Sequence, residues 1–267
     1  MNHRIRLVAL WLAILATNAW SAIDYSDTWW TPAEPGWGAN FAQQANTIYV
    51  TFYVYGSDGK STWFAALLAR DGAGERFTGV LSRTSGTPFG APNWNGYTIN
   101  PAGSATFTAT SSTAGTLAYT VDGFNVTKAI ERITLAPLNI AGVYLGGVSG
   151  RRSGCSGASV IIDPIQIEVL HSPSTGAVRI DQRSTTTGTL FCRMEGVAVQ
   201  TGKLMTIANA SYSCSDGWNK PARVFNLRPT PGGFEAQWFS DGVAVARRAV
   251  SSRALRRLRD ASVPTRA

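Results

Sequence analysis

The stretch Ile48-Tyr49-Val50-Thr51-Phe52-Tyr53-Val54-Tyr55-Gly56-Ser57-Asp58-Gly59-Lys60 decides the fold class of this chain. In its first eight residues, apolar side chains alternate with Tyr and Thr, and a period of two is typical of a β-strand with one apolar and one tyrosine-rich face. The Asp58-Gly59 pair that follows predicts a tight turn into a return strand. We therefore expect a β-hairpin here.

Segments of the same kind recur along the whole chain. In the first half we expect strands at 62–69, 76–83, 104–110, 115–121 and 125–135. The longest loop is expected around Pro88, Pro92, Trp94 and Pro101. Beyond Pro137 we expect strands at 142–145, 159–170, 177–184, 189–199, 204–213, 222–227, 233–239 and 243–250. Charge is sparse at 15% and helical periodicity is hard to find, so we predict an all-β protein of two small antiparallel barrel-like (calycin-like) domains in tandem.

The first 22 residues have the pattern of a secretory signal peptide. Arg4 and Arg6 precede an apolar run from Leu7 to Ala16, and small residues follow up to Ala22. No later stretch reaches the ~18 apolar residues that a membrane-spanning helix needs. The expected organisation is a signal peptide at 1–22, an N-terminal barrel at 23–137, a C-terminal β domain at 138–250 and a basic tail at 251–267. We expect a soluble, exported protein, periplasmic or extracellular, without a transmembrane segment.

The positive charge lies mostly outside the expected domains. Of the formal net charge of +8, the signal peptide contributes two and the tail from Ser251 contributes four, which leaves two on the rest of the chain. A folded body this close to neutrality argues against nucleic acid as a partner. The tail is expected to be a solvated terminus, or alternatively to contact an anionic envelope surface.

The densest chemistry lies just after the signal peptide, in Trp29-Trp30-Thr31-Pro32-Ala33-Glu34-Pro35-Gly36-Trp37-Gly38-Ala39-Asn40-Phe41. Three Trp side chains carry large apolar surfaces whose N–H groups need partners. Two Pro and two Gly residues restrict the backbone around the carboxylate of Glu34. We consider two roles for this opening motif, a plug that closes one end of the barrel and a surface that contacts a ligand. Different rings can serve different roles.

The last expected strand of the first domain carries two cations on an apolar face. Phe124, Val126, Lys128, Ile130 and Arg132 share this face, which we expect to point inward. Buried cations need partners, and Glu34 and the faces of the Trp rings are available for ion pairing and cation–π contacts. A Trp of the first strand stacked under an Arg of the last is similar to the barrel closure of lipocalin-type proteins. The candidate binding residues are therefore Trp29, Trp30, Glu34, Trp37, Asn40, Lys128 and Arg132.

Residues from about 25 to 135 resemble a secreted bacterial module with a Trp-Trp-x-Pro-x-Glu-x-Gly-Trp-Gly-x-Asn opening. The resemblance continues through Gln43-Gln44, Asp58-Gly59-Lys60 with Trp63, Leu81 to Gly86, and Val121 to Arg132. This module occurs alone or attached to exported hydrolases and has no assigned activity. The resemblance implies an exported accessory or binding domain. In the second half, the segments 192–196, 200–202 and 211–217 resemble another exported bacterial β module that contains disulfides.

The three cysteines lie in the second half, at Cys155, Cys192 and Cys214, so an oxidising compartment leaves one unpaired. A hairpin that turns near Thr201-Gly202 places Cys192 opposite Ser211. A three-residue offset is about 10 Å, too far for a bond to Cys214 unless a bulge, for example at Gly196, shifts the register. The resemblance favours Cys192–Cys214. It also implies that the family's partner for Cys155 falls near residues 241–244, where this chain has no cysteine, so Cys155 is expected to be free.

Catalytic motifs are scarce. Beyond the signal peptide the only histidine is His171, so a multi-histidine metal site is not expected, and a surface histidine is the commoner case. Asp24, Asp27 and Glu34 lie among aromatic residues, as the carboxylates of a glycosidase do, but no spacing fixes two of them at a working separation.

We therefore expect no catalytic residues, no metal and no cofactor. The expected function is that of an exported non-catalytic protein that binds a glycan, peptide or other envelope component through an aromatic-rich barrel end. Two alternatives remain, a secreted hydrolase with carboxylate acid/base chemistry and a small-ligand carrier with an apolar barrel cavity.

Overall fold

The structure is a computed structural model that describes residues 23–72, 74–148, 151–152, 163–230, 233–240 and 243–250. Every regular element in these residues is a β-strand and none is a helix, which confirms the predicted all-β class. The predicted signal peptide, the basic tail and Cys155 lie outside the described residues. Within these residues, no helix has the length and apolar character of a membrane-spanning helix.

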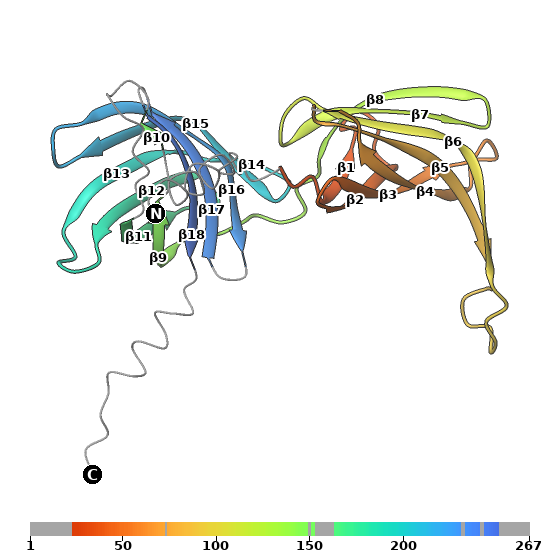
Figure 1. Ribbon diagram of the computed structural model, residues 1–267, viewed down its shortest axis with the longest axis horizontal. Helices are drawn as coiled ribbons and strands as arrows, with labels where there is room; N and C mark the ends of the chain where they lie inside the picture. The colour runs from red at the N-terminus through yellow and green to blue at the C-terminus, as the bar shows by residue number, and fades with distance from the viewer. Residues whose placement is uncertain are drawn as a thin grey trace, which may run out of the picture. The chain divides into compact units, whose positions relative to one another are not determined.

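The first eight strands form a closed barrel, as the meander pattern predicts (Figure 1). They are β1 (Asp27–Trp30), β2 (Gly38–Gln44), β3 (Thr47–Tyr55), β4 (Ser61–Arg70), β5 (Arg76–Gly86), β6 (Tyr97–Ala109), β7 (Ala114–Val121) and β8 (Phe124–Arg132). Antiparallel pairing of β8 with β1 closes the ring, with Trp29 opposite Arg132. The last strand therefore closes the barrel onto the opening motif, as the sequence indicated.

The remaining strands form one curled sheet. They are β9 (Gly142–Val148), β10 (Arg151–Arg152), β11 (Asp163–His171), β12 (Ala177–Ser184), β13 (Leu190–Val197), β14 (Val199–Thr201), β15 (Leu204–Cys214), β16 (Asn219–Thr230), β17 (Gly233–Ser240) and β18 (Val243–Val250). The order in the sheet is β10-β18-β17-β16-β15-β13-β12-β11-β9, with β14 paired to β15. β18, which lies next to the edge strand β10, also pairs with β9 at the other end of the order. The sheet therefore curls round on itself.

By packing, the chain divides into two units. Among the described residues, the first comprises 23–26 together with Gly36–Ala129, and the second comprises Asp27–Pro35 together with the described residues from Ile130 onward. The packing thus assigns β1 and the end of β8 to the second unit, although their backbone hydrogen bonds complete the barrel. The domain limits predicted from the sequence, at residues 22, 137 and 250, stay predictions.

Aromatic rings pack edge to face in the core of the first unit. Tyr25 contacts Phe77 and Phe107 at centroid distances of 5.9 and 5.2 Å, and Phe41 contacts Phe107 at 5.0 Å. These four side chains are at most 2% exposed. Packed rings of this size occupy the interior space that a small-ligand carrier would keep open, so the core does not favour a carrier.

The core of the second unit is mostly aliphatic. It contains Ile, Val, Leu and Met side chains from β11 to β17, with Phe234 and Trp238 as its aromatic members. These residues alternate along their strands with outward-facing polar residues, as expected for a sheet with one buried face.

The longest predicted loop of the first half is confirmed around Pro88, Pro92 and Trp94, which lie between β5 and β6, but it is shorter than expected. β5 continues to Gly86, and β6 already begins at Tyr97 and includes Pro101. The register shifts by one residue where Leu81 pairs with Gly103 and Ser82 with Pro101. A bulge at this point lets the strand accommodate a proline, which has no N–H to donate. Only the placement of Pro101 in the loop was wrong.

The Cys192–Cys214 disulfide is present, with the two residues directly opposite each other on β13 and β15. Two local features remove the three-residue offset that the sequence suggested. The turn lies at Gly202-Lys203, because Thr201 pairs with Leu204. One extra residue then lies in β15, between Thr206, which pairs with Val199, and Ala210, which pairs with Gly196. The bulge is therefore in β15 and not at Gly196.

Candidate binding surface

Trp29 of the opening motif and Arg132 of β8 lie in the interior. Both side chains are at most 1% exposed, and the guanidinium carbon of Arg132 lies 5.0 Å from the centroid of the Trp29 ring. An Arg132 nitrogen lies 3.0 Å from the carboxylate of Asp27. This is the expected cation–π closure, and Asp27 supplies the ion pair. Trp29 and Arg132 offer no side-chain surface to a ligand in solution, so for them the structure supports the plug.

Asp27 joins several parts of the second unit through hydrogen bonds. Its carboxylate accepts hydrogen bonds from Arg132, from the Thr28 N–H at 3.0 Å and from the Lys203 N–H at 3.1 Å. Gly202, at the neighbouring turn, donates its N–H to the hydroxyl of Thr134 at 2.9 Å. Charge-assisted hydrogen bonds of this kind hold a carboxylate in one orientation. The Asp27 carboxylate thus has a structural role, because its oxygens are already used in these hydrogen bonds. It is a poor candidate for acid/base catalysis.

The other candidates of the opening motif lie nearer the surface. Glu34 is exposed in the turn after β1, where its N–H donates to the Thr31 carbonyl at 2.9 Å. Trp30, Trp37 and Lys128 are half-buried. Asn40 is exposed on β2, opposite Thr51 of β3. Of the seven predicted residues, Asn40 lies beside a group of exposed aromatic side chains on the neighbouring strands.

These aromatic side chains come from the tyrosine-rich face of the strand that defined the fold class. Tyr49, Tyr53 and Tyr55 of β3 are 47, 56 and 58% exposed, and Trp63 of β4 is 46% exposed. We call these four residues together with Leu67 of β4 the aromatic face. They are exposed because the alternate residues, Ile48, Val50 and Phe52, fill the barrel core.

The strand register brings the members of the aromatic face together. Tyr53 lies directly opposite Trp63, and Tyr49 lies opposite Leu67. Side chains opposite each other on one face have Cβ atoms about 5 Å apart, so these are contact pairs. Between them, the outward-pointing Ala65 is only 8% exposed, so its neighbours cover it.

Small residues on β2 leave the rings uncovered on their other side. Gly38 lies opposite Tyr53, and Ala42 lies opposite Tyr49. Neither neighbour has a side chain long enough to cover a Tyr ring. Near the end of the face, a Cβ added to Gly36 would lie 3.4 Å from the Tyr55 hydroxyl, so the turn of the opening motif approaches this ring closely. The arrangement is a shallow, mostly uncharged platform with Asn40 and Thr51 as polar groups inside it.

A second cluster, on the curled sheet, surrounds Asp181. This carboxylate is fully buried and accepts two hydrogen bonds from Arg193, at 2.7 and 3.0 Å. Nitrogens of Arg183 and Arg179 lie 3.3 and 3.6 Å from it. The hydrogen bond from Arg193 is the main cause that lowers the pKa of Asp181 below its ordinary value. This cluster was not predicted, although the Arg-x-Asp-x-Arg alternation of residues 179–183 on one strand indicates it.

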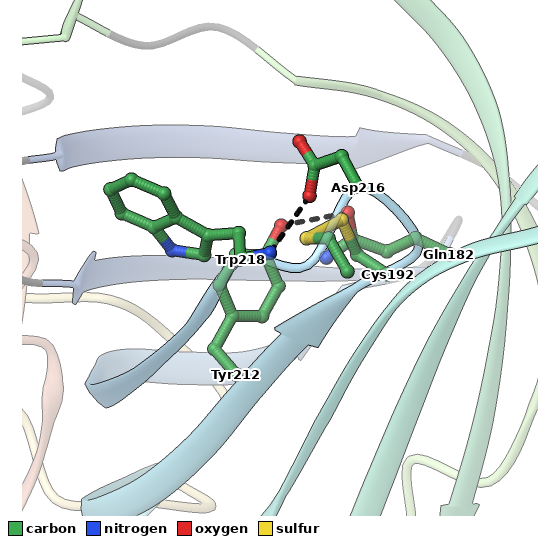
Figure 2. The surroundings of a disulfide bond; sticks show 6 residues. Gln182, Cys192, Tyr212, Asp216 and Trp218 are labelled. Carbon is green, nitrogen blue, oxygen red and sulfur yellow. Dashed lines mark hydrogen bonds between the residues drawn. A yellow bond between two sulfur atoms is a disulfide. The ribbon is translucent and has the colours of Figure 1, made fainter.

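The disulfide lies beside a small polar group (Figure 2). The Tyr212 hydroxyl is 3.3 Å from Oε1 of Gln182, and the Trp218 N–H donates to Asp216 at 3.0 Å. Gln182 is 1% exposed, and the structure shows no partner for its Nε2 atom. Both cysteines are half-buried, and their bond joins directly opposite residues of two neighbouring strands. This position within one sheet indicates a structural role for the disulfide.

His171, the predicted single histidine, is half-buried at the end of β11. Its Nδ1 atom accepts the Ile140 N–H at 3.4 Å, and burial lowers its pKa below the ordinary value. Within the described residues, no group of three or more His, Cys, Asp or Glu side chains could hold a metal ion.

Comparison of the chain with protein-family models, with curated proteins and with solved structures found no match. The fold and the surface define an all-β protein with a closed barrel and an exposed aromatic platform.

Proposed function

We propose that this is an exported, non-catalytic protein that binds a glycan on the aromatic face. The observation that carries the proposal is the row of four rings, each about half exposed, beside the small residues Gly38 and Ala42. Large exposed apolar patches mark interaction sites on proteins. The platform lies on the outer face of the barrel wall and not at the barrel end.

The chemistry of the aromatic face suits a sugar chain. A Tyr or Trp ring carries negative charge on its face and attracts the positively polarised C–H groups on the flat side of a pyranose. Asn40 and Thr51, together with the Tyr hydroxyls, supply neutral donors and acceptors for sugar hydroxyls. A ligand that binds by stacking and neutral hydrogen bonds fits this surface better than a charged peptide does.

Two features support export. One is the signal-peptide pattern at 1–22, and the other is the Cys192–Cys214 disulfide, a bond typical of oxidising compartments.

The test is a titration of the processed protein with soluble polysaccharides and cell-wall muropeptides, followed by calorimetry and by acrylamide quenching of tryptophan fluorescence. The variant Tyr53→Ala/Trp63→Ala should weaken binding at least about tenfold, because two stacking rings are removed. Tyr97→Ala is the control, since Tyr97 is also exposed, at 67%, but lies outside the aromatic face. The proposal fails if no glycan binds, or if both variants bind as the wild type does. Binding of a peptide instead would assign the surface to the alternative ligand class.

A further inference from the structure

The hairpin of β5 and β6 extends beyond the barrel wall. Pairing of β4 with β5 ends at Ala65 with Ser82, and pairing of β6 with β7 begins at Gly103. Between these limits β5 and β6 pair only with each other, up to Gly86 with Tyr97. Figure 1 shows this hairpin and its loop projecting past the other strands of the barrel. We call residues 84–100 the arm.

The base of the arm is fixed to the barrel. Arg83, just before it, is ion-paired with Asp122 at 2.7 Å and lies over the ring of Phe64 at 5.0 Å. The arm is also ordered internally. The Thr87 hydroxyl accepts the Asn95 N–H at 2.7 Å, and the hydroxyls of Ser85 and Thr98 are 2.7 Å apart. A projection that is already ordered loses little conformational entropy when it binds.

The arm exposes large apolar side chains at its far end. Phe89 is 109% exposed and Trp94 is 71% exposed, both in the loop between the strands. Behind them on β6, Tyr97 and Ile99 are 67 and 57% exposed, and the ring of Tyr97 lies 6.4 Å from that of Trp94. Exposed rings on an ordered projection indicate a surface that a binding partner covers.

The charge pattern of the arm indicates what kind of partner it binds. From Thr84 to Val121 the sequence contains no Asp, Glu, Lys, Arg or His. Binding to a charged partner surface is favoured by complementary charges, and the arm supplies none. Side chains at a bilayer interface show the pattern seen here, with Phe in the acyl region and Trp and Tyr at the level of the headgroups. The neutral Thr, Ser and Asn side chains of the arm fit the hydrated headgroup layer.

We propose that the arm docks the protein on a lipid bilayer, with Phe89 and Trp94 inserted at the boundary between headgroups and acyl chains. Insertion is shallow, because the outer edges of the two strands carry backbone N–H and C=O groups that need water or headgroups as partners. The binding needs no anionic lipid, since the arm has no charge. This inference does not rest on the glycan proposal, because it concerns different residues.

The experiment is co-sedimentation of the processed protein with vesicles of pure phosphatidylcholine, at low and high salt. The wild type should bind these neutral vesicles equally at both salt concentrations. Phe89→Ser/Trp94→Ser should lower the partition coefficient at least about tenfold, since each ring buries a large apolar surface. The matched control is Tyr53→Ser/Trp63→Ser, which removes two exposed rings from the aromatic face and should bind as the wild type does.

Three outcomes would overturn the proposal. The first is that the wild type does not bind neutral vesicles. The second is that the arm variant, with an unchanged urea unfolding midpoint, binds as strongly as the wild type. The third is binding that requires phosphatidylglycerol and is lost at high salt, which would assign the contact to the cationic tail. Self-association that the arm variant loses, without vesicle binding, would assign the arm to a second copy of the chain.

Discussion

Replacement of Asp181 by Asn tests whether the buried ion-pair cluster stabilises the curled sheet. Asp181 on β12 lies opposite Arg193 on β13 and opposite Glu168 on β11. Its side chain is 1% exposed, whereas those of Arg179, Arg183 and Arg193 are 28 to 36% exposed. Asn has nearly the same volume, so the variant removes the negative charge without leaving a cavity.

The magnitude follows from this geometry. Removing one partner of a fully buried ion pair costs about 3–5 kcal/mol. Here water reaches the three arginines and reduces the cost of leaving them without the carboxylate, so we expect a loss of about 2 kcal/mol in the free energy of unfolding. The effect should depend on pH. The folded-state pKa of Asp181 lies below its unfolded value, so the stabilisation is present above about pH 4 and is lost as the pH falls through the folded pKa.

The assay is urea unfolding of wild type and Asp181→Asn, monitored by near-ultraviolet circular dichroism at pH 7 and at pH 3. The difference in stability should be about 2 kcal/mol at pH 7 and smaller at pH 3. The control is Asp122→Asn, which breaks the exposed pair with Arg83 and should cost under about 0.5 kcal/mol. An Asp181→Asn variant as stable as the wild type at pH 7 would refute the reasoning.

Three further predictions concern the second unit. Gly202→Ala should destabilise it by about 2–3 kcal/mol, because Gly202 has a φ of +62° and the added Cβ would lie 2.5 Å from that of Arg132. The variant Cys192→Ser/Cys214→Ser should lose about 3 kcal/mol, because the bond closes a loop over a sequence separation of 22 residues. His171 should titrate below its ordinary pKa of 6.5 in a pH-dependent NMR experiment, so stability should fall as the pH drops below 6.5.

Each of these predictions has its own check. Gly188 has a φ of +70° with open space around it, so Gly188→Ala should cost only about 1 kcal/mol in urea unfolding, and equal losses for the two glycine variants would contradict the steric argument. For the disulfide, addition of dithiothreitol to the wild type should reproduce the unfolding midpoint of the double variant; an unchanged midpoint in both would contradict a stabilising bond. For His171, a titration at or above pH 6.5 would contradict the effect of burial.

The closure of the barrel shows which features of the site could be predicted from the sequence. The alternation from Ile48 to Tyr55 predicted the strand, and the pattern on the last strand of the barrel predicted that Arg132 turns inward toward a Trp. Both are confirmed. The identity of the ion-pair partner was not predicted, because Asp27 reaches Arg132 only through the pairing of β1 with β8, 105 residues apart in sequence.

The candidate binding surface was predicted less well. The sequence drew attention to the Trp-rich opening motif, because composition shows where apolar rings are concentrated but not which of them are buried. The Tyr residues of β3 were recognised as one face of a strand. Their proximity to Trp63 depends on the β3–β4 register, and their exposure depends on the opposite face filling the core.

The sequence by itself determined the all-β class, the meander of the first half and the inward position of Arg132, because a period of two and turn residues are local properties of the chain. Only the tertiary structure decided which rings are exposed, that the Pro-rich segment 84–100 forms a projecting arm, and that Cys192 lies opposite Cys214. Each of these depends on bulges and strand register, and a shift of one residue in register exchanges the buried and exposed faces of a strand.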